Sequence, residues 1–198
     1  MTTRLFLFLA LVFVTALPAS AERPRPLGWA IDAAREGNWD RAAQIAARDG
    51  EVAEDVIEWM RLRAGGGTYT EVSDFLRRNQ DWPQERQLRR RAENVVIPQN
   101  DARVRAFFEV TPPQTPEGVL RYAAVLRAEG RAQEADAAIV GAWRNMPMST
   151  IEQALFTGPN EKLLADHHDA RLNAMLWRGA FENARRIFGM ASKGAVAV

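Results

Sequence analysis

The two histidines of this chain stand side by side within residues 165–179, which read ADHHDARLNAMLWRG. Histidine next to aspartate could bind a metal ion or transfer protons. On a helix, however, His167 and His168 would point about 100° apart, whereas a helical metal pair needs a spacing of three or four residues. The chain has no cysteine and no third histidine, so only carboxylates could complete a site. We therefore predict no metal and no cofactor here.

The residues around the histidines favour a structural role. His168 shares a helical stripe with three apolar residues, Leu172, Met175 and Leu176. His167 can reach Arg171 one turn later. We expect a half-buried histidine whose hydrogen bonds are satisfied within a pair of helices.

The motifs of the common enzyme classes are missing from the sequence. It contains no G-x-S-x-G nucleophile turn, no phosphate-binding G-x-x-x-x-G-K loop and no H-E-x-x-H zinc motif. Paired carboxylates can cleave glycosides, but pairs such as Glu54 with Asp55 fall in amphipathic helices, where exposure to solvent explains them. We therefore assign no catalytic residue from residue types alone.

Positive charge is concentrated in residues 77–105, which hold eight arginines and four acidic residues. We prefer a solvated helix face with internal ion pairs to a patch that binds an anionic polymer. Most of the six tryptophans are expected in helix cores, but Trp82 falls in a predicted loop and could stack on a sugar. The residues that could contact a glycan are Trp82, Arg86, Arg89 and Arg90.

The start of the chain has the pattern of a secretory signal peptide. Arg4 precedes an apolar run over residues 5–17, and Ala19-Ser20-Ala21 is a typical cleavage site. The run is shorter than the roughly 20 residues that span a bilayer, so we predict a periplasmic protein with no membrane span after cleavage. Without cysteine, neither a lipid anchor nor a disulfide is expected.

The composition is that of a folded protein without a preference for nucleic acid. Hydrophobic residues make up 47% of the chain and charged residues 26%, as in ordinary globular proteins. Removing residues 1–21 removes Arg4 and no acidic residue, so the formal net charge falls from +1 to zero. A neutral chain argues against nucleic acid as a partner.

Helix signals repeat along the chain, and strand signals are missing. Helices are predicted over residues 27–36 and 39–48, which stop at Gly37 and Gly50. A third helix, over residues 52–64, has an apolar stripe of Val52, Val56, Trp59 and Met60. The predicted organisation is a signal peptide (1–21), a Pro-rich lead-in (22–26), a helical scaffold (27–190) and a tail (191–198).

Several residues mark where further helices begin or break. Thr68 with Glu71, and Ser149 with Glu152, form capping boxes. Each of three prolines, Pro83, Pro116 and Pro159, fits the first turn of a helix. Breaks are expected at residues 97–98 and 111–115.

Three of the predicted turns share the pattern G-x-x-x-x-A, beginning at Gly37, Gly130 and Gly179. Glycine permits a tight reversal, and the alanine one turn into the next helix lets two helices approach closely. The pattern is typical of tetratricopeptide-like helix pairs, although the unequal spacing does not match a regular repeat of about 34 residues. We predict an all-α fold, an irregular α-solenoid or superhelix of antiparallel helix pairs.

Two stretches resemble the N-terminal superhelical region of the soluble lytic murein transglycosylases, periplasmic enzymes that cleave peptidoglycan glycan strands. Residues 75–83, FLRRNQDWP, followed by Leu88 and Ala92-Glu93, are similar to a hairpin repeated in that family. Residues 168–177, HDARLNAMLW, resemble a helix near the end of the same region. The likeness extends over roughly residues 52–188.

The resemblance also implies what the chain lacks. Family enzymes carry a lysozyme-like domain with a catalytic glutamate in a Glu-Ser motif, followed by Gly-Leu-Met-Gln, and neither motif occurs here. No catalytic residue can therefore be carried over. Asn173 stands where the family commonly has an acidic residue, so an ion pair expected there is in doubt.

Three functional hypotheses follow. The first is the helical scaffold part of a periplasmic lytic transglycosylase, which positions murein strands for a catalytic lysozyme-like domain missing from this chain and is inactive alone. In that case arginines of residues 77–105 would meet peptide-stem carboxylates. The alternative is a stand-alone tetratricopeptide-like adaptor that binds periplasmic proteins. The third is a helical enzyme that uses His167 or His168.

Overall fold

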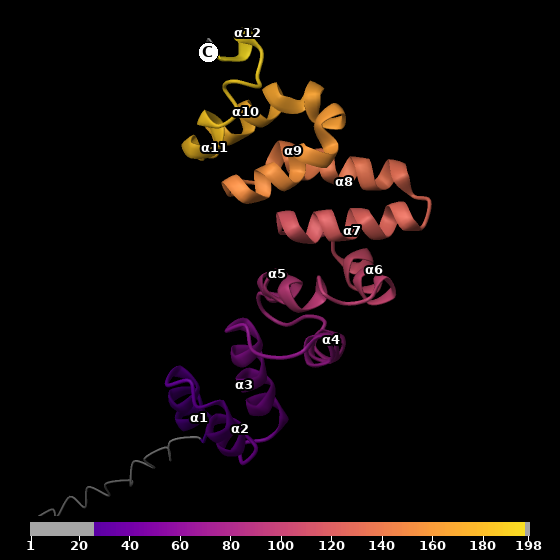
Figure 1. Cartoon of the computed structure of the whole chain (residues 1–198). Helices are drawn as coiled ribbons and strands as arrows, with labels where there is room; N and C mark the ends of the chain where they lie inside the picture. Colours follow the sequence, from indigo (N-terminus) through magenta and orange to yellow (C-terminus); the bar gives the residue numbers. More distant parts are fainter. Residues whose placement is uncertain (1–25, 197–198) are drawn as a thin grey trace, which may run out of the picture.

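The computed structural model describes residues 26–196, and every regular element within that range is helical. The elements are α1 (Pro26–Arg35), α2 (Trp39–Ala46), α3 (Glu51–Arg63), α4 (Tyr69–Arg78), α5 (Glu85–Val96), α6 (Asp101–Val110), α7 (Pro116–Ala128), α8 (Ala132–Asn145), α9 (Thr150–Leu164), the 3₁₀ turn η1 (Ala165–His167), α10 (His168–Trp177), α11 (Phe181–Arg185) and α12 (Lys193–Val196). Figure 1 shows them stacked in an elongated row, with α1 and α12 near opposite ends. The prediction of an all-α fold is confirmed, and the predicted signal peptide lies outside the described residues.

The hydrophobic core is divided into three clusters that follow one another along the chain. The first lies among α1, α2 and α3, the second among α3 to α7, and the third among α7 to α12. Helix α7 belongs to two of them, because Val125 is buried in the second cluster whereas Val119 and Ala123 are buried in the third. The helices therefore pack mainly against their neighbours in the sequence.

The predicted capping boxes are both present. Thr68 accepts a hydrogen bond from the Glu71 N–H at 3.3 Å, and Glu71 accepts one from the Thr68 N–H at 2.7 Å. Ser149 and Glu152 form the same reciprocal pair. Each box satisfies N–H groups that a helix start leaves without partners.

The three G-x-x-x-x-A turns have one shared geometry. Their glycines, Gly37, Gly130 and Gly179, all adopt positive φ, between 68° and 79°. The residue after each glycine donates its N–H to the carbonyl five residues earlier, which is the Schellman ending of a helix. The alanines one turn into the next helix, Ala42, Ala135 and Ala184, are buried. The prediction of three tight reversals between closely approaching helices is confirmed.

Of the three prolines expected in first helical turns, one lies there. Pro116 begins α7, behind an N-cap formed by Thr115. Pro83 instead precedes α5 by two residues, and Gln84 between them takes the left-handed conformation with φ of 62°. Pro159 lies inside α9, directly before a kink at Asn160. Proline has no N–H to donate to the preceding turn of a helix, so it fits a kink as well as a helix start.

Other boundaries also differ from the prediction. Val52 is exposed, and the buried face of α3 is formed by Ala53, Ile57 and Leu62, one position away from the expected stripe. Gly50 does not end α2, which stops at Ala46; it is the N-cap of α3. In the sequence, the small Ala53 indicates a buried face less clearly than the larger apolar Val52 beside it.

The expected tail contains a further short helix. Asp169 of α10 accepts hydrogen bonds from the N–H and hydroxyl of Ser192, both at 2.7 Å, and Ser192 lies directly before α12. These bonds attach the end of the described chain to α10. Within residues 26–196, no helix is both long enough and apolar enough to cross a bilayer.

Candidate functional site

A hollow of about 1040 Å³ lies where four segments meet: the first turns of α5, the α6–α7 connection, the α8–α9 connection and the end of α10. We call it the basic groove. Four arginines line it, Arg86, Arg89, Arg90 and Arg178, together with a single acidic residue, Glu85. Three of these arginines were predicted as glycan contacts. Arg178 was missed, because nothing in the sequence places α10 beside α5.

The first wall of the groove is the α6–α7 connection, which is fastened to α5 by a buried carboxylate. Glu93 accepts hydrogen bonds from the Gln114 N–H at 2.6 Å and the Thr115 N–H at 3.0 Å, and a third from the Thr115 hydroxyl. A Cβ added at Gly118 would overlap the Glu93 carboxylate, so glycine is needed there. Burial raises the pKa of Glu93, although its hydrogen bonds oppose this shift.

Arg86 holds the same wall from the other side. Its Nε donates to Oε1 of Gln114 at 3.1 Å, and Nε2 of Gln114 donates to the Arg86 carbonyl at 2.9 Å. The two residues therefore bind each other reciprocally. Arg86, predicted as a glycan contact, is already engaged in fixing the shape of the groove.

The second wall is the α8–α9 connection, which is fastened by cations. The fully buried Arg171 donates to the Met146 carbonyl at 2.9 Å and also to the Trp143 carbonyl. Arg186 donates to the Met148 carbonyl. The Arg171 bonds satisfy carbonyl groups that the end of α8 leaves without partners, and the Arg186 bond holds the residue before the N-cap of α9.

Arg171 is buried without an acidic partner among residues 26–196. Its guanidinium lies over the ring of Trp143, with its carbon 4.3 Å from the ring centroid. Burial lowers the pKa of Arg171 to about 10, and the like charge of Arg186 adds to this shift. The group stays protonated at neutral pH, so the ring and the carbonyl oxygens take the place of a counter-ion.

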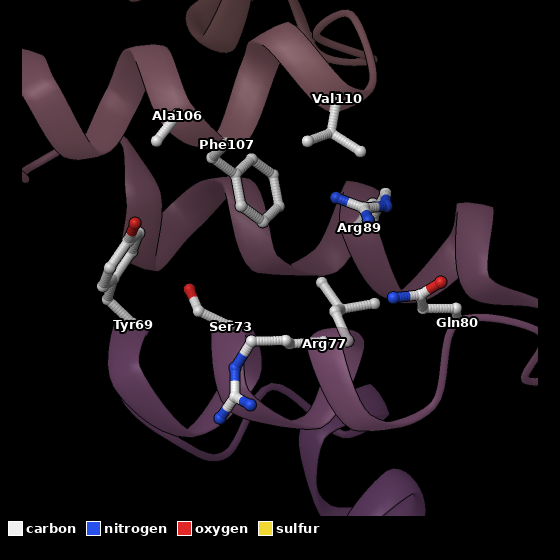
Figure 2. A pocket seen from close by; sticks show the side chains of 9 residues that line it. Tyr69, Ser73, Arg77, Gln80, Arg89, Ala106, Phe107 and Val110 are labelled. Atoms are coloured by element: carbon white, nitrogen blue, oxygen red, sulfur yellow. The ribbon is translucent and has the colours of Figure 1, made fainter.

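The arginines of residues 77–105 divide into engaged and unengaged side chains. Four form ion pairs, as expected for a solvated helix face: Arg77, Arg78, Arg89 and Arg105. Arg89 donates to Glu85 at 2.7 Å and also lines a second hollow, between α4 and α6 (Figure 2). In the basic groove, Arg90 and Arg178 are exposed and make no side-chain hydrogen bond or ion pair within residues 26–196.

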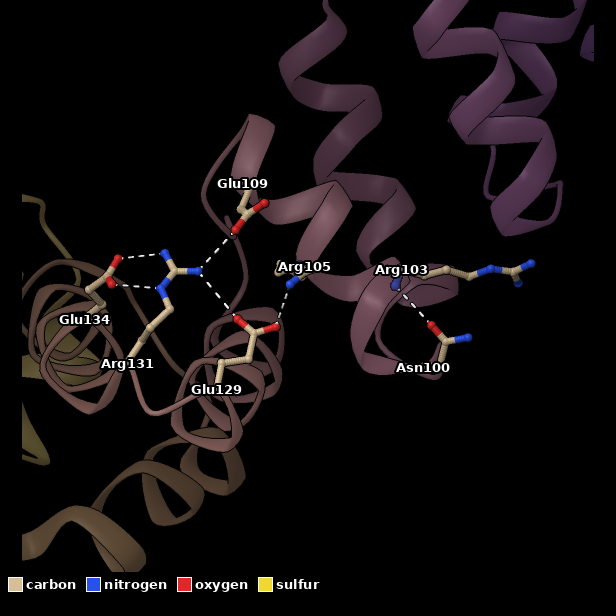
Figure 3. Close-up of polar contacts among 7 residues, drawn as sticks. All are labelled: Asn100, Arg103, Arg105, Glu109, Glu129, Arg131 and Glu134. Atoms are coloured by element: carbon tan, nitrogen blue, oxygen red, sulfur yellow. Dashed lines mark hydrogen bonds and ion pairs between the residues drawn. The ribbon is translucent and has the colours of Figure 1, made fainter.

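Arg105 belongs to a network that fixes α6 against the α7–α8 hairpin (Figure 3). Arg105 pairs with Glu129 at 3.1 Å, and Arg131 pairs with Glu134 at 2.8 Å and Glu109 at 3.1 Å. Such exposed pairs are individually weak, but the network connects three consecutive helices. These cations therefore serve the packing of helices and are not available to a ligand.

Trp82 is placed in the loop between α4 and α5, as predicted, but it does not line the basic groove. Its half-buried ring meets Phe75 edge to face, with the ring centroids 5.5 Å apart, and packs on the second core cluster. An aromatic pair of this geometry stabilises the fold. Of the four predicted contacts, only Arg89 is therefore less accessible than Trp82.

The role predicted for the histidines is confirmed in part. His168 is half-buried and lies 5.6 Å from Trp143, ring centroid to ring centroid. Its Nδ1, however, is buried without a hydrogen-bond partner among the described residues, so its bonds are not satisfied as expected. Burial lowers the pKa of His168. The expected contact from His167 to Arg171 is wrong, because Arg171 turns inward to the end of α8.

The described part of the chain contains no cluster of metal-binding side chains. Within residues 26–196, no three His, Asp or Glu side chains lie close enough together to hold a metal ion. Comparison with known proteins finds no matching family model, no matching curated protein and no matching solved structure. The geometry and charge of the groove are therefore the observations on which a functional proposal depends.

Proposed function

We propose that this chain is a periplasmic helical scaffold that positions peptidoglycan strands, of the kind found in soluble lytic murein transglycosylases, and that it does not cleave them alone. The basic groove is the observation that carries the proposal. Arg90 and Arg178 have no partner within residues 26–196, and they face a groove with one acidic residue. Carboxylates of peptidoglycan peptide stems are suitable ligands, since guanidinium and carboxylate form strong charge-assisted hydrogen bonds.

The fastened walls support a binding role. Both connections that border the groove are held by buried side chains, Glu93 on one side and Arg171 on the other. A groove whose walls are already ordered loses less conformational entropy on binding than a mobile loop does. The resemblance of residues 75–83 to the family hairpin favours a peptidoglycan ligand over other anionic polymers.

The proposal is tested by sedimentation of the purified chain with murein sacculi. The variant Arg90→Glu/Arg178→Glu should bind at least about tenfold more weakly, since two attractive charges become repulsive. A matched control is Arg41→Glu/Arg48→Glu, which makes the same charge change on exposed arginines of the first hairpin region, far along the row in Figure 1. Equal loss in both variants would show that binding follows net charge and not the groove. Release of anhydro-sugar fragments would contradict the absence of cleavage.

A second candidate, a stand-alone adaptor for periplasmic proteins, is favoured by one observation. Trp177 is 87% exposed and Phe181 is 67% exposed, on either side of the turn between α10 and α11. Exposed aromatic side chains of this kind are enriched at protein interfaces. Capture of specific periplasmic proteins that is lost in Trp177→Ser/Phe181→Ser, while sacculus binding is absent, would support the adaptor over the scaffold.

A further inference from the structure

A second hollow, of about 450 Å³, lies between α4 and α6 and is separate in its lining from the basic groove except at Arg89. We call it the α4–α6 hollow. Figure 2 shows apolar side chains of α6 facing polar side chains of α4 across it. The residues that matter for its chemistry are Ser73, Leu76, Arg89, Phe107 and Val110. It is therefore an apolar depression with a cation at one side.

Arg89 is the cation, and it is placed unusually for an arginine. The residue is only 9% exposed, yet it lines both hollows. Its Nε donates to Glu85 at 2.7 Å, while its two terminal nitrogens have no hydrogen-bond partner within residues 26–196. A guanidinium has five N–H donors, so most of its donors are unused. Its carbon lies 5.5 Å from the centroid of the Phe107 ring, which forms the apolar side of the hollow.

A second polar group in the hollow also lacks a partner. The Ser73 hydroxyl oxygen is buried and makes no hydrogen bond with any described residue. In Figure 2 it points from α4 toward Ala106 and Phe107. A buried hydroxyl without a partner is unfavourable, and a ligand atom that hydrogen-bonds to it would remove that cost.

We propose that the α4–α6 hollow binds the C-terminal carboxylate and a small apolar side chain of a short peptide, with Arg89 as the anchor of the carboxylate. Leu76, Phe107 and Val110 provide the apolar surface for the side chain. The proposal does not depend on whether the basic groove binds peptidoglycan.

The local charges select a monoanion. Glu85 already offsets part of the Arg89 charge, and Arg77 at the edge of the hollow is paired with Asp74 at 3.0 Å. Because each arginine of the hollow is already paired with an acidic residue, little net positive charge is left for a phosphate with two negative charges. A carboxylate, with one charge and two oxygens, matches the unused nitrogens of a single guanidinium.

The first test is calorimetric titration of the purified chain with N-acetyl-alanyl-alanine and with its C-terminal amide. The acid should bind at least tenfold more tightly than the amide. Val110→Asp places a negative charge at the hollow on a residue that is 67% exposed, and it should weaken binding of the acid at least fivefold. The control Val52→Asp makes the same change at a 72% exposed valine of α3 and should leave binding unchanged.

Glu85→Gln sharpens the test, because it removes the residue that competes with a ligand for Arg89. Affinity for the acid should rise severalfold, while affinity for the amide stays the same. Arg89→Gln should abolish the difference in affinity between the acid and the amide. If that variant does not fold, the opposite effects of Glu85→Gln and Val110→Asp on affinity for the acid still test the proposal. Equal binding of acid and amide, or no binding of either, overturns the proposal. Loss of sacculus binding in the Arg90/Arg178 variant is a separate result, because neither residue lines the α4–α6 hollow.

Discussion

The α6–α7 and α8–α9 connections both border the basic groove, yet they are fastened by side chains of opposite charge. Glu93 accepts from the N–H groups of the N-cap of α7 and the residue before it, whereas Arg171 donates to carbonyls at the end of α8. A helix start leaves N–H groups unpaired and a helix end leaves carbonyls unpaired. The nearer helix end therefore decides which charge can hold a connection in place.

The two fastenings differ in how the buried charge is compensated. Glu93 has the positive charge of Arg90 nearby, which favours its ionised form. Arg171 has a like charge nearby, Arg186, and depends on the Trp143 ring and on neutral carbonyl oxygens. Arg171 is also longer and reaches both the last turn of α8 and the residue after it. We therefore expect loss of Arg171 from the α8–α9 connection to lower stability more than loss of Glu93 from the α6–α7 connection.

The largest effect is expected for Arg171→Ala. The substitution leaves a cavity beside Trp143 and removes the donor from two carbonyls, so the free energy of unfolding should fall by about 3–5 kcal/mol. Chemical denaturation measures this loss. The control is Arg144→Ala, at an exposed arginine of α8, the helix whose end Arg171 contacts from α10, and it should change stability by less than about 0.5 kcal/mol. A loss below about 1 kcal/mol in Arg171→Ala would contradict the comparison.

Glu93→Gln should have a smaller effect, about 1–3 kcal/mol, because the amide keeps one acceptor oxygen and places N–H donors against the N–H groups of residues 114 and 115. The effect should also depend on pH. Since the folded-state pKa of Glu93 is raised, its contribution is complete below its ordinary value near 4.5 and is lost as pH rises through the folded value. The destabilisation by Glu93→Gln should therefore be larger at pH 5 than at pH 8.

The opposite pH trend would be informative. If Glu93→Gln destabilised more at pH 8 than at pH 5, the hydrogen bonds from Gln114 and Thr115 would outweigh burial, and the folded-state pKa of Glu93 would be lowered. The comparison with Arg171 would then become one between two fully charged fastenings.

The smallest effects are expected from two glycines. Gly118→Ala should destabilise by about 1–2 kcal/mol, because the new methyl group displaces Glu93 from its hydrogen bonds. Gly141→Ala, in α8, meets no atom within 4 Å and should stabilise by about 0.5–1 kcal/mol through helix propensity. Thermal unfolding compares the two variants. Stabilisation by both would mean that Glu93 can be moved without cost.

Features that depend on neighbouring residues could be predicted from the sequence. The capping boxes and the three glycine turns are formed within a few residues, so their residue types are sufficient to identify them. The fastenings could not be predicted in this way. Glu93 meets Gln114 across 21 residues and Arg171 meets Trp143 across 28, and only the stacking of helices brings these partners together.

The same limit applies to the candidate site. The run of arginines in α5 identified Arg86, Arg89 and Arg90, but residue type could not distinguish engaged from unengaged side chains. Arg86 binds Gln114 from a distant loop, whereas Arg90 is without a partner in the described chain. Arg178 directly follows α10, five α-helices after α5, and its charge alone gave no sign that it borders the same groove.

The division of the core into three consecutive clusters has a consequence for how the chain acquires its structure. Each cluster is made by segments that are close in sequence, so each can form with little loop-closure entropy. A polypeptide synthesised from its N-terminal end can complete the α1–α3 cluster before α8 has been made. Helix α7 contributes buried residues to both the second and the third cluster. It is therefore the element that connects the N-terminal part of the molecule to the C-terminal part.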